Sequence, residues 1–404
     1  MSADDRAAHR RTVQVHVGRY PHPLYREQLH AAPDGWRYRW NHPALGDATA
    51  PTKRVVERRS PLAGARERAE TAGLRVASEL GYVHVNRAPR AEGAELIHSA
   101  ERLLWRSPLP YVLDFEHLVL FVLYQNAALG RPWTRAVLER ALLDERLRFL
   151  LPWSEAARQS IAASLGPDAA ARLEPKVRVV SPAIRLARER APEPAPGPLR
   201  VLFVGTLFFD KGGVEAVRAV ERLRESHDVH LDLVSYVPDD WRARCEASGA
   251  ITVHQPGGVD LVFALYERSD VLLFPSHMDT FGYVVLEAMA HGIPVLAPRH
   301  LALAETVQDE VNGLLFDPEN MLYDADTRCA FRHVLPPPDS YLERLRNPSD
   351  AYVTSIAETI ARLAEDPGLR ARLSAGATAA VADGPLSIAR RRATLRAIYD
   401  EAAA

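Results

Sequence analysis

Asp279 and Glu287 are two acidic residues in an otherwise mostly apolar part of the chain, and seven residues separate them. The apolar run 271–274 fits a buried strand, and the residues from 281 to 290 have the pattern of a helix. Asp279 and Thr280 precede this helix, and both are good helix-capping residues. Glu287 would then lie about two turns along, nearly beneath Asp279. Open α/β folds bind ligands at such an edge, where a strand ends and a helix begins.

Lys211 is followed by two glycines, Gly212 and Gly213, between a predicted strand over 199–204 and a predicted helix over 214–225. Glycines let backbone N–H groups approach a ligand closely, and the start of a helix adds positive potential. An ammonium group at this point neutralises the charge of a phosphate. The junction therefore predicts a diphosphate site. The competing interpretation is a lysine that is only solvated in a turn.

A third group of polar residues follows a predicted strand in the first half of the chain. Asp114, Glu116 and His117 come at the end of the apolar run 111–115. The parallel strands of an α/β domain present such residues at the edge that faces a ligand. One interpretation gives at least one of the three a ligand-binding role. The other is that Asp114 or Glu116 caps a helix predicted over 118–127.

Strands and helices alternate along the rest of the chain, which is the pattern of an α/β fold with parallel sheets. Further strands are predicted over 13–17, 96–99, 148–152, 176–180, 231–234, 251–254 and 293–297. Helices are predicted after Ser154 and over 260–267, 351–364, 369–381 and 386–399, and a surface hairpin over 312–318. The proline-rich segment 191–198 reads APEPAPGP and fits an extended, semi-rigid linker between two domains.

Length and composition fit two globular domains: the chain has 404 residues, of which 47% are hydrophobic and 25% charged. The formal net charge of -2 argues against nucleic acid as a partner but leaves room for a local basic patch that contacts a membrane surface. The two cysteines, Cys245 and Cys329, lack metal-ligand spacing and favour a reduced, intracellular setting. No apolar segment resembles a secretory signal, and no apolar run reaches about twenty residues. We therefore expect a cytoplasmic protein without a transmembrane segment.

The residues around Asp279 resemble the donor-binding signature of glycosyltransferase family 4, the retaining transferases of GT-B fold. In that family an acid is followed by Phe-Gly, by a second acid, and by Ala-Met-Ala-x-Gly-x-Pro-Val. The matching residues are Asp279, Phe281, Gly282, Glu287, Ala288, Met289, Ala290, Gly292, Pro294 and Val295. The resemblance implies that Asp279, Thr280 and the backbone at Phe281 and Gly282 hold the sugar of the donor, and that Glu287 holds the ribose. Asp279 stands where Glu is usual, so its shorter side chain would reach the sugar through water or at a different hydroxyl.

The junction at Lys211 resembles the Gly-Arg-x(4)-Lys-Gly motif of the same family. The matching residues are Gly205, Lys211 and Gly212. Thr206 stands where the family has Arg, which removes a bidentate phosphate clamp. Either another cation, such as Arg19 or Arg299, replaces it, or the donor is held more weakly. The resemblance implies that Lys211 and helix-terminal N–H groups hold the diphosphate.

Two other parts of the family pattern are less well defined in this chain. A residue at the end of a first-domain strand often lies near the 6-position of the sugar. Glu116 and His117 both fit that position by register, and both remain candidates for a catalytic role. His254 begins a short segment, 254–258, that lies where the family commonly contacts the nucleotide base.

The resemblance implies two Rossmann-like, doubly wound domains that face a cleft. Residues 1–190 would bind the acceptor, 191–198 would link the domains, 199–385 would bind the nucleotide sugar, and 386–404 would form a helix that crosses back to the first domain. The implied function is retaining transfer of a sugar from a nucleotide diphosphate sugar to the hydroxyl of an unidentified glycan, lipid or secondary metabolite, without metal or cofactor. The alternatives are a non-catalytic GT-B sugar-binding or partner subunit, and a GT-B epimerase or phosphorylase.

Two charged segments remain. Asp324 and Asp326 form an Asp-x-Asp triplet, but it lies in a polar segment rather than after an apolar strand, so we expect no metal there. Residues 323–350 make a long connection, which suggests an insertion near the site. The run of three arginines at 390–392 is expected to form a solvated helix face.

Overall fold

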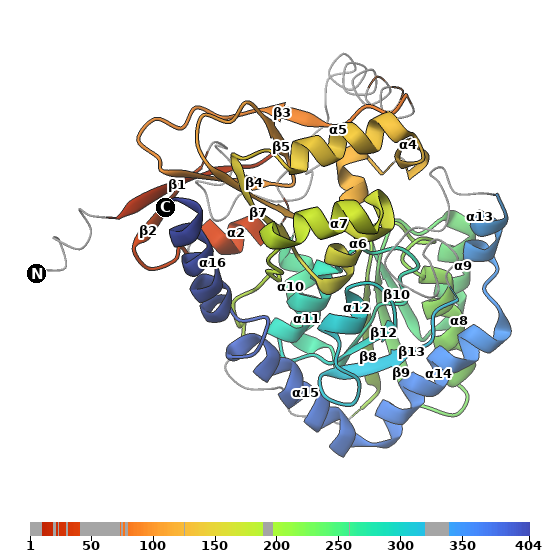
Figure 1. The fold of residues 1–404 in the computed structure, drawn as a ribbon. Helices are drawn as coiled ribbons and strands as arrows, with labels where there is room; N and C mark the ends of the chain where they lie inside the picture. The colour runs from red at the N-terminus through yellow and green to blue at the C-terminus, as the bar shows by residue number, and fades with distance from the viewer. Residues whose placement is uncertain are drawn as a thin grey trace, which may run out of the picture. The chain divides into compact units, whose positions relative to one another are not determined.

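A computed structural model describes residues 10–18, 22, 24–29, 31–40, 73, 76, 80–124, 126–188, 197–257, 259–319 and 339–404. The chain forms two compact units (Figure 1). Among the described residues, unit 1 contains those up to Pro182 together with 388–404, and unit 2 contains 183–319 and 339–387. The chain divides between Pro182 and Ala183, before the predicted linker, most of which lies outside the described residues.

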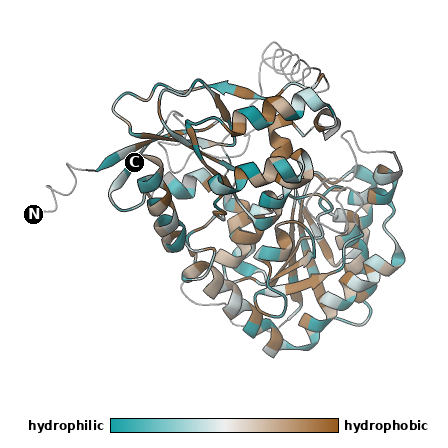
Figure 2. Ribbon diagram, in the orientation of Figure 1, coloured by the Kyte–Doolittle hydropathy of each residue, from teal (hydrophilic) through white to brown (hydrophobic). Residues whose placement is uncertain are grey.

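Unit 2 is built on a six-stranded parallel sheet with the strand order β10-β9-β8-β11-β12-β13. Counted along the unit, this is the 3-2-1-4-5-6 order of the Rossmann fold. The strands are β8 (Leu199–Val204), β9 (Val229–Val234), β10 (Ile251–His254), β11 (Val271–Leu273), β12 (Val295–Pro298) and β13 (Gly313–Phe316). Most of their residues are buried and apolar, as expected for a parallel sheet covered on both faces (Figure 2).

Several helices of unit 2 bury apolar side chains in the same core as residues of this sheet. In α8 (Gly213–Leu223), Val214, Val217 and Val220 recur at helical spacing and are fully buried. They share a core with Ile356 and Ile360 of α14 (Asp350–Glu365), which packs beside α8. The remaining helices are α9 (Asp239–Ser248), α10 (Val259–Arg268), α11 (Tyr283–Ala290), α12 (Leu303–Thr306), α13 (Asp339–Arg346) and α15 (Pro367–Ala382).

Unit 1 contains a five-stranded parallel sheet with the order β2-β1-β4-β6-β7, the 2-1-3-4-5 order of another doubly wound fold. Its strands are β1 (Arg11–His16), β2 (Trp36–Trp40), β4 (Leu96–Ala100), β6 (Tyr111–Phe115) and β7 (Leu147–Pro152), and a separate pair is formed by β3 (Val85–Arg87) and β5 (Leu103–Trp105). Its helices are α2 (Leu24–Leu29), α4 (Asn126–Leu129), α5 (Pro132–Leu142), α6 (Glu155–Leu165), α7 (Pro167–Leu173) and α16 (Ile388–Ala402).

The last helix, α16, is held in unit 1 by a buried polar network. Its Tyr399 hydroxyl lies 2.5 Å from Nδ1 of His98, whose Nε2 lies 3.0 Å from Oδ2 of Asp114. The hydroxyl of Tyr25 donates to the other oxygen of Asp114 at 2.6 Å. Burial opposes ionisation of Asp114, but His98 and Arg391 outweigh it and hold the pKa of this carboxyl below its usual value.

Arg391 corrects the expectation that the arginine run forms a solvated face, because this side chain is buried. Its guanidinium donates to the carbonyl oxygens of Val180 and Ser181 and lies 3.8 Å from Asp114. A buried guanidinium needs such acceptors, since burying an unpaired charge is costly. The position is therefore a structural anchor for α16.

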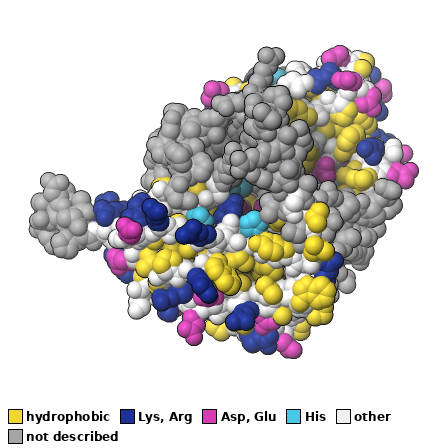
Figure 3. Space-filling model, turned by 90° about the horizontal axis from the view of Figure 1, so that it is seen from above, with side chains coloured by type: hydrophobic (Ala, Val, Ile, Leu, Met, Phe, Trp, Pro, Cys, Tyr) yellow, Lys and Arg dark blue, Asp and Glu magenta, His cyan; other side chains and the backbone are white. Residues whose placement is uncertain are grey.

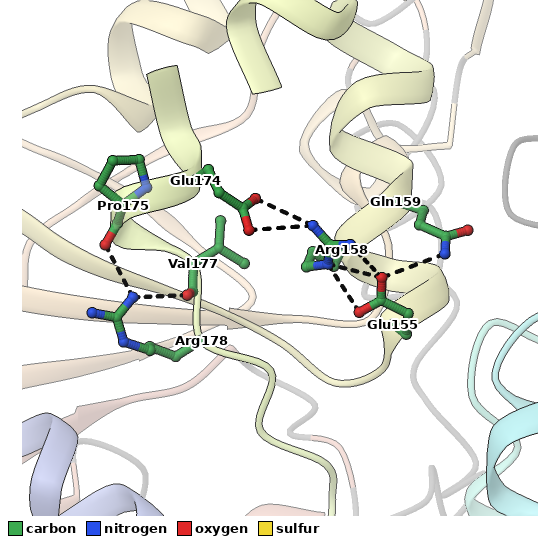
Figure 4. A network of polar contacts seen from close by, with 7 residues as sticks. All are labelled: Glu155, Arg158, Gln159, Glu174, Pro175, Val177 and Arg178. Atoms are coloured by element: carbon green, nitrogen blue, oxygen red, sulfur yellow. Dashed lines mark hydrogen bonds and ion pairs between the residues drawn. The ribbon is translucent and has the colours of Figure 1, made fainter. Parts of the chain in front are cut away.

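Three local predictions were wrong. The helix expected over 118–127 is a 3-10 helix, η2 (Leu118–Val122), because Leu123 and Tyr124 adopt left-handed conformations and end it. The segment 176–180 forms only a single bridge, from Val177 to Leu150, and the Arg178 side chain bonds to nearby carbonyl oxygens (Figure 4). The hairpin expected over 312–318 is instead β13, a parallel partner of β12. Among the described helices, none is long and apolar enough to cross a bilayer.

Candidate functional site

The site in unit 2 lies where β8 and β11 end side by side. β8 is followed by a connection toward β9 on one side, and β11 by a connection toward β12 on the other. Such a reversal of strand order opens a crevice at the carboxyl ends of the strands, where doubly wound folds bind ligands. The loops that follow these two strands contain Lys211 and Asp279.

Lys211 and Asp279 form an ion pair across this crevice. Nζ of Lys211 lies 2.7 Å from Oδ2 of Asp279 and donates to the carbonyl oxygen of Met278 at 2.9 Å. The two side chains are 21% and 17% exposed, so a ligand can still reach both. Gly205 lies beneath the lysine, and a Cβ there would come within 2.7 Å of the Lys211 Cβ. The lysine stem therefore depends on the absence of a side chain at residue 205.

Gly212 brings the start of α8 against the loop that follows β11. Its φ of +79° is one that other residues rarely adopt, and a Cβ would lie 2.2 Å from the carbonyl oxygen of Pro275. The first N–H groups of α8 follow directly, and a helix N-terminus attracts anions. The Lys211 ammonium and this helix start thus provide positive charge at one point, which suits a phosphate group.

The loop from Asp279 to Gly282 differs from the prediction. Helix α11 begins at Tyr283 rather than at Phe281, because Gly282 has a φ of +78° and acts as the N-terminal cap. Asp279 therefore lies in the loop before the helix, so the expectation that Glu287 lies beneath it on one helix face was wrong. Oδ1 of Asp279 accepts the backbone N–H of Phe281 at 3.3 Å, and Thr280 lies between them. This bond leaves Oδ2 directed to Lys211.

Glu287 lies in the second turn of α11 and is half-buried. Its Oε2 accepts a hydrogen bond of 3.3 Å from the hydroxyl of Tyr266 in α10. Burial, reinforced by the negative charge of Glu287, raises the pKa of Tyr266 well above its usual value, so this phenol keeps its proton and remains a donor. A carboxylate fixed in this way accepts hydrogen bonds from ligand hydroxyls.

Sequence reasoning missed a layer of histidines behind the crevice. Nε2 of His277 lies 2.5 Å from Oε1 of Glu215, and both side chains are almost fully buried. His300 donates from Nε2 to the carbonyl oxygen of Ser276 at 2.7 Å, and burial lowers its pKa to about 4. The His277–Glu215 contact joins the loop after β11 to α8, and the His300–Ser276 contact joins the same loop to the segment that follows β12. His277 lies two positions before Asp279 and Glu215 four positions after Lys211, but no local pattern links the two residues.

His254, predicted to contact a nucleotide base, ends β10, and β9 separates β10 from β8. Its Nε2 lies 2.8 Å from Oδ1 of the buried Asp232, which also takes an ion pair of 2.7 Å from Arg268. His254 thus lies at the correct edge of the sheet, but its ring is held by Asp232. No described contact joins it to Lys211 or Asp279.

The residues predicted in unit 1 have different surroundings. His117 is buried, and its Nδ1 accepts the N–H of Val119 at the start of η2. Glu116 is half-buried and accepts a hydrogen bond from the hydroxyl of Tyr124. Sequence reasoning missed Glu101, whose φ is +56°. Burial raises its pKa well above the usual value, and the nearby Glu116 and Asp114 add to that increase.

Two cations were proposed to replace the missing arginine. Arg299 forms an ion pair of 2.7 Å with Asp309, and Arg19 lies outside the described residues. Asp324 and Asp326 also lie outside the described residues, as does most of the segment 323–350. In the described part of the chain, no group of three or more His, Cys, Asp or Glu side chains is arranged to hold a metal ion.

Comparisons with known proteins agree with this geometry. Residues 198–327, which contain the crevice, match the model of the family described as Glycosyl transferases group 1. The D-inositol 3-phosphate glycosyltransferase of Xylanimonas cellulosilytica is 32% identical over 200 residues, which are 48% of this chain and 40% of that protein. The chain spans about half the length, or less, of several curated relatives that it matches.

Solved structures extend the likeness to the whole chain. A glycosyltransferase from Rickettsia africae superposes with a TM-score of 0.60 at 13% identity, over 97% of this chain and 98% of that one. Anabaena Alr3699/HepE in complex with UDP-glucose gives 0.58 at 13% identity, over 97% and 100%. The fold is therefore that of the GT-B glycosyltransferases, as the sequence predicted, and residues 198–327 match the glycosyl transferases group 1 model.

Proposed function

We propose that the protein is a glycosyltransferase that moves a sugar from a nucleotide diphosphate sugar to an acceptor hydroxyl, with retention of configuration and without a metal ion. The observation that carries this proposal is the position of Lys211. Lys211 precedes the start of α8 by two residues, where the strand order of a Rossmann sheet reverses, and its ammonium lies 2.7 Å from a carboxylate. A diphosphate and the sugar attached to it need these two kinds of group side by side.

In the proposed reaction the protein contributes mainly by binding and by stabilising charge, rather than by forming covalent bonds. The bond between the anomeric carbon and the diphosphate oxygen breaks, and its electron pair remains on that oxygen. The acceptor hydroxyl bonds to the same carbon on the same face, and its proton passes to the departing phosphate oxygen. Stabilising the charge on the leaving group is then the main contribution, made by Lys211 and the N–H groups at the start of α8. Because these groups neutralise the diphosphate, the proposal requires no metal and no further cofactor.

The other residues have binding roles in this proposal. Asp279, Thr280 and the backbone at Phe281 and Gly282 hold the hydroxyls of the donor sugar, and Glu287 holds the ribose. His254 and Thr206 also contact the nucleotide in this proposal, but with smaller contributions to binding. Asp232 already holds the imidazole of His254, and Thr206 lacks the positive charge of an arginine. In unit 1, Glu116 and His117 are the residues to test for a contribution to catalysis.

The test is incubation of the protein with a panel of donors, starting with UDP-glucose because that nucleotide sugar is bound in the Anabaena neighbour. Mixed hydroxyl acceptors are added, and nucleoside diphosphate release and products are followed by mass spectrometry. NMR of the product determines the configuration at the anomeric carbon. Product of the donor's configuration supports the proposal. Binding of donors without turnover would identify a non-catalytic subunit, while an isomerised donor or a sugar phosphate would identify an epimerase or a phosphorylase.

A further inference from the structure

Helix α5 of unit 1 carries large apolar side chains on the face opposite its core contacts. Thr134, Leu138 and Leu142 are buried, whereas Trp133 is 59% exposed and Val137 is 51% exposed. These two residues are four positions apart and therefore share one helix face. Single exposed apolar residues are ordinary, but an exposed tryptophan with a second apolar residue on one short helix is the beginning of a patch.

The preceding segment extends this patch. Leu80 is 70% exposed and Tyr82 is 48% exposed. The glycine between them fixes the segment against the start of α5, because its carbonyl oxygen accepts the Thr134 hydroxyl at 2.8 Å. A Cβ at that glycine would lie 2.9 Å from Nε1 of Trp133. Leu80 and Tyr82 flank this glycine, and Trp133 and Val137 lie one turn apart on α5, so we call these four residues the Trp133 patch.

Unbalanced positive charge surrounds the Trp133 patch. Arg131 lies with its guanidinium 5.8 Å from the centre of the Trp133 ring. Within the described part of the chain, neither Arg131, Arg135 nor Arg140 forms an ion pair with a carboxylate. The one acid of α5, Glu139, is already paired with Arg172 of α7. Arg131 lies against the Trp133 ring, and Arg140 follows Val137 by one helical turn, so two uncompensated guanidinium groups flank the exposed side chains. Arg135 is two positions from both Trp133 and Val137 and lies on another face of the helix.

We propose that the Trp133 patch docks on the surface of an anionic phospholipid bilayer. Tryptophan and tyrosine prefer the interface between headgroups and acyl chains, and arginine pairs with lipid phosphates. Apolar residues on one face of a helix, with arginines beside them, are typical of segments that lie in the plane of that interface. The charge is the deciding feature, because two unpaired cations beside the exposed apolar side chains match a negatively charged surface. Figure 3 shows that hydrophobic side chains reach the surface beside Lys and Arg in several places.

A second exposed tryptophan of unit 1 has a similar partner. Trp105 in β5 is 63% exposed, and the guanidinium of Arg106 lies 5.6 Å from the centre of its ring. Trp105 is paired in register with Arg87 of β3, five residues after Tyr82 in the chain.

The proposal is independent of the donor site, since all of these residues belong to unit 1 and Lys211 belongs to unit 2.

The experiment is co-sedimentation of the full chain with vesicles of phosphatidylcholine alone and with vesicles that contain about a third phosphatidylglycerol. Binding is expected with the anionic vesicles and should weaken as salt rises, because salt screens the attraction between charges. Equal binding to both kinds of vesicle, or binding to neither, would overturn the proposal.

Matched variants locate the contact. Val137→Ser and Trp133→Ser should each reduce the partition coefficient severalfold, whereas Val311→Ser, at a 50% exposed valine of unit 2, should not change it. Arg140→Gln should reduce it about fivefold, as expected for one basic residue near such a surface, whereas Arg135→Gln, on another face of the same helix, should have a smaller effect. Arg372→Gln, at an exposed arginine of unit 2, is the charge control.

Circular dichroism and thermal unfolding should match the wild type for all variants, because the substituted side chains are exposed or, for Arg135, half-buried, and none belongs to the core. Wild-type binding by both Val137→Ser and Arg140→Gln would remove the basis for the proposal. Sedimentation velocity provides a separate test. If the wild type self-associates and Trp133→Ser does not, the Trp133 patch is an interface between copies of the chain and the bilayer proposal is wrong.

Discussion

Nζ of Lys211 lies 2.7 Å from Oδ2 of Asp279, although 68 positions separate the two residues in the sequence. The ammonium therefore has a carboxylate partner before any ligand arrives. A diphosphate that binds at the start of α8 must share or replace that partner, which makes the ion pair part of the binding equilibrium. It also holds the Asp279 carboxylate in place for a neighbouring hydroxyl group.

Replacing Lys211 should affect turnover more than binding. Negative charge grows on the departing diphosphate, so a cation there stabilises the transition state more than the ground state. Lys211→Ala should lower kcat on the order of a hundredfold, by analogy with the loss of one preorganised charge stabiliser. Lys211→Arg should recover part of the rate, because the broader guanidinium retains the charge but not the shape. Steady-state kinetics on purified variants measures both effects.

Two controls accompany the lysine variants. Lys176→Ala removes an ammonium from unit 1, where it bonds to the carbonyl oxygen of Asp144, and should leave kcat unchanged. Thr206→Arg restores the residue that is usual in family 4 and should leave the rate the same or slightly higher. A wild-type rate for Lys211→Ala together with an inactive Thr206→Arg would place the diphosphate elsewhere.

Glu287→Ala should weaken nucleotide binding. The carboxylate is proposed to accept hydrogen bonds from the ribose, and loss of a hydrogen bond to a charged group costs roughly 1–3 kcal/mol. Isothermal titration calorimetry with a nucleoside diphosphate measures this change directly. Tyr266→Phe is the matched control, because it removes the 3.3 Å hydrogen bond to Glu287 and keeps the carboxylate. A smaller loss is expected there, and unchanged affinity of Glu287→Ala would refute the ribose assignment.

Chelator should not change the activity. Lys211 and the start of α8 are proposed to neutralise the diphosphate, so turnover with excess EDTA should equal turnover with magnesium or manganese. Rates measured side by side under the three conditions decide the question. If activity disappears with chelator and returns with one ion, Asp324 and Asp326 become the first candidates for its ligands.

The stability of unit 2 should decrease as pH falls from about 6.5 toward 4. Burial lowers the pKa of His300 to about 4, so between these values the unfolded chain binds a proton that the folded chain excludes. Stability therefore rises with pH through this window, by up to about 3 kcal/mol for such a shift. Hydrogen exchange of β11 and β12 at several pH values measures it. In His300→Gln the slope should be smaller, and an unchanged slope would show that His300 does not cause it.

Much of the fold could be predicted because its strands are continuous apolar runs with clear ends. The bounds of β8 and β6 agree with the predicted 199–204 and 111–115, and Ser154 caps α6 as expected, with its hydroxyl accepting the N–H of Ala157. The sequence pattern gave a wrong prediction, or none, where contacts between distant parts of the chain determine the local structure. Residues 176–180 alternate like a strand, but they form only one bridge to β7. Trp36–Trp40 and Pro132–Leu142 were not predicted at all.

The site was predictable to the extent that its residues are close in sequence. The loop around Asp279 and the glycines after Lys211 each carry a local pattern, and the resemblance to family 4 supplied the link between them. The Glu215–His277 contact joins residues 62 positions apart, and no local pattern reveals such a pair. Arg391 shows the same limit, since its burial depends on carbonyl groups more than two hundred positions earlier in the chain.

The assignment of α16 to unit 1 has a consequence for how the protein is made. Domains generally fold in order from the N-terminus as the ribosome releases them. Here Tyr399 and Arg391 complete the surroundings of His98 and Asp114, but they are synthesised some three hundred residues later. The first unit to emerge is therefore the last to be finished, and until then its buried aspartate lacks part of the positive charge that keeps it ionised.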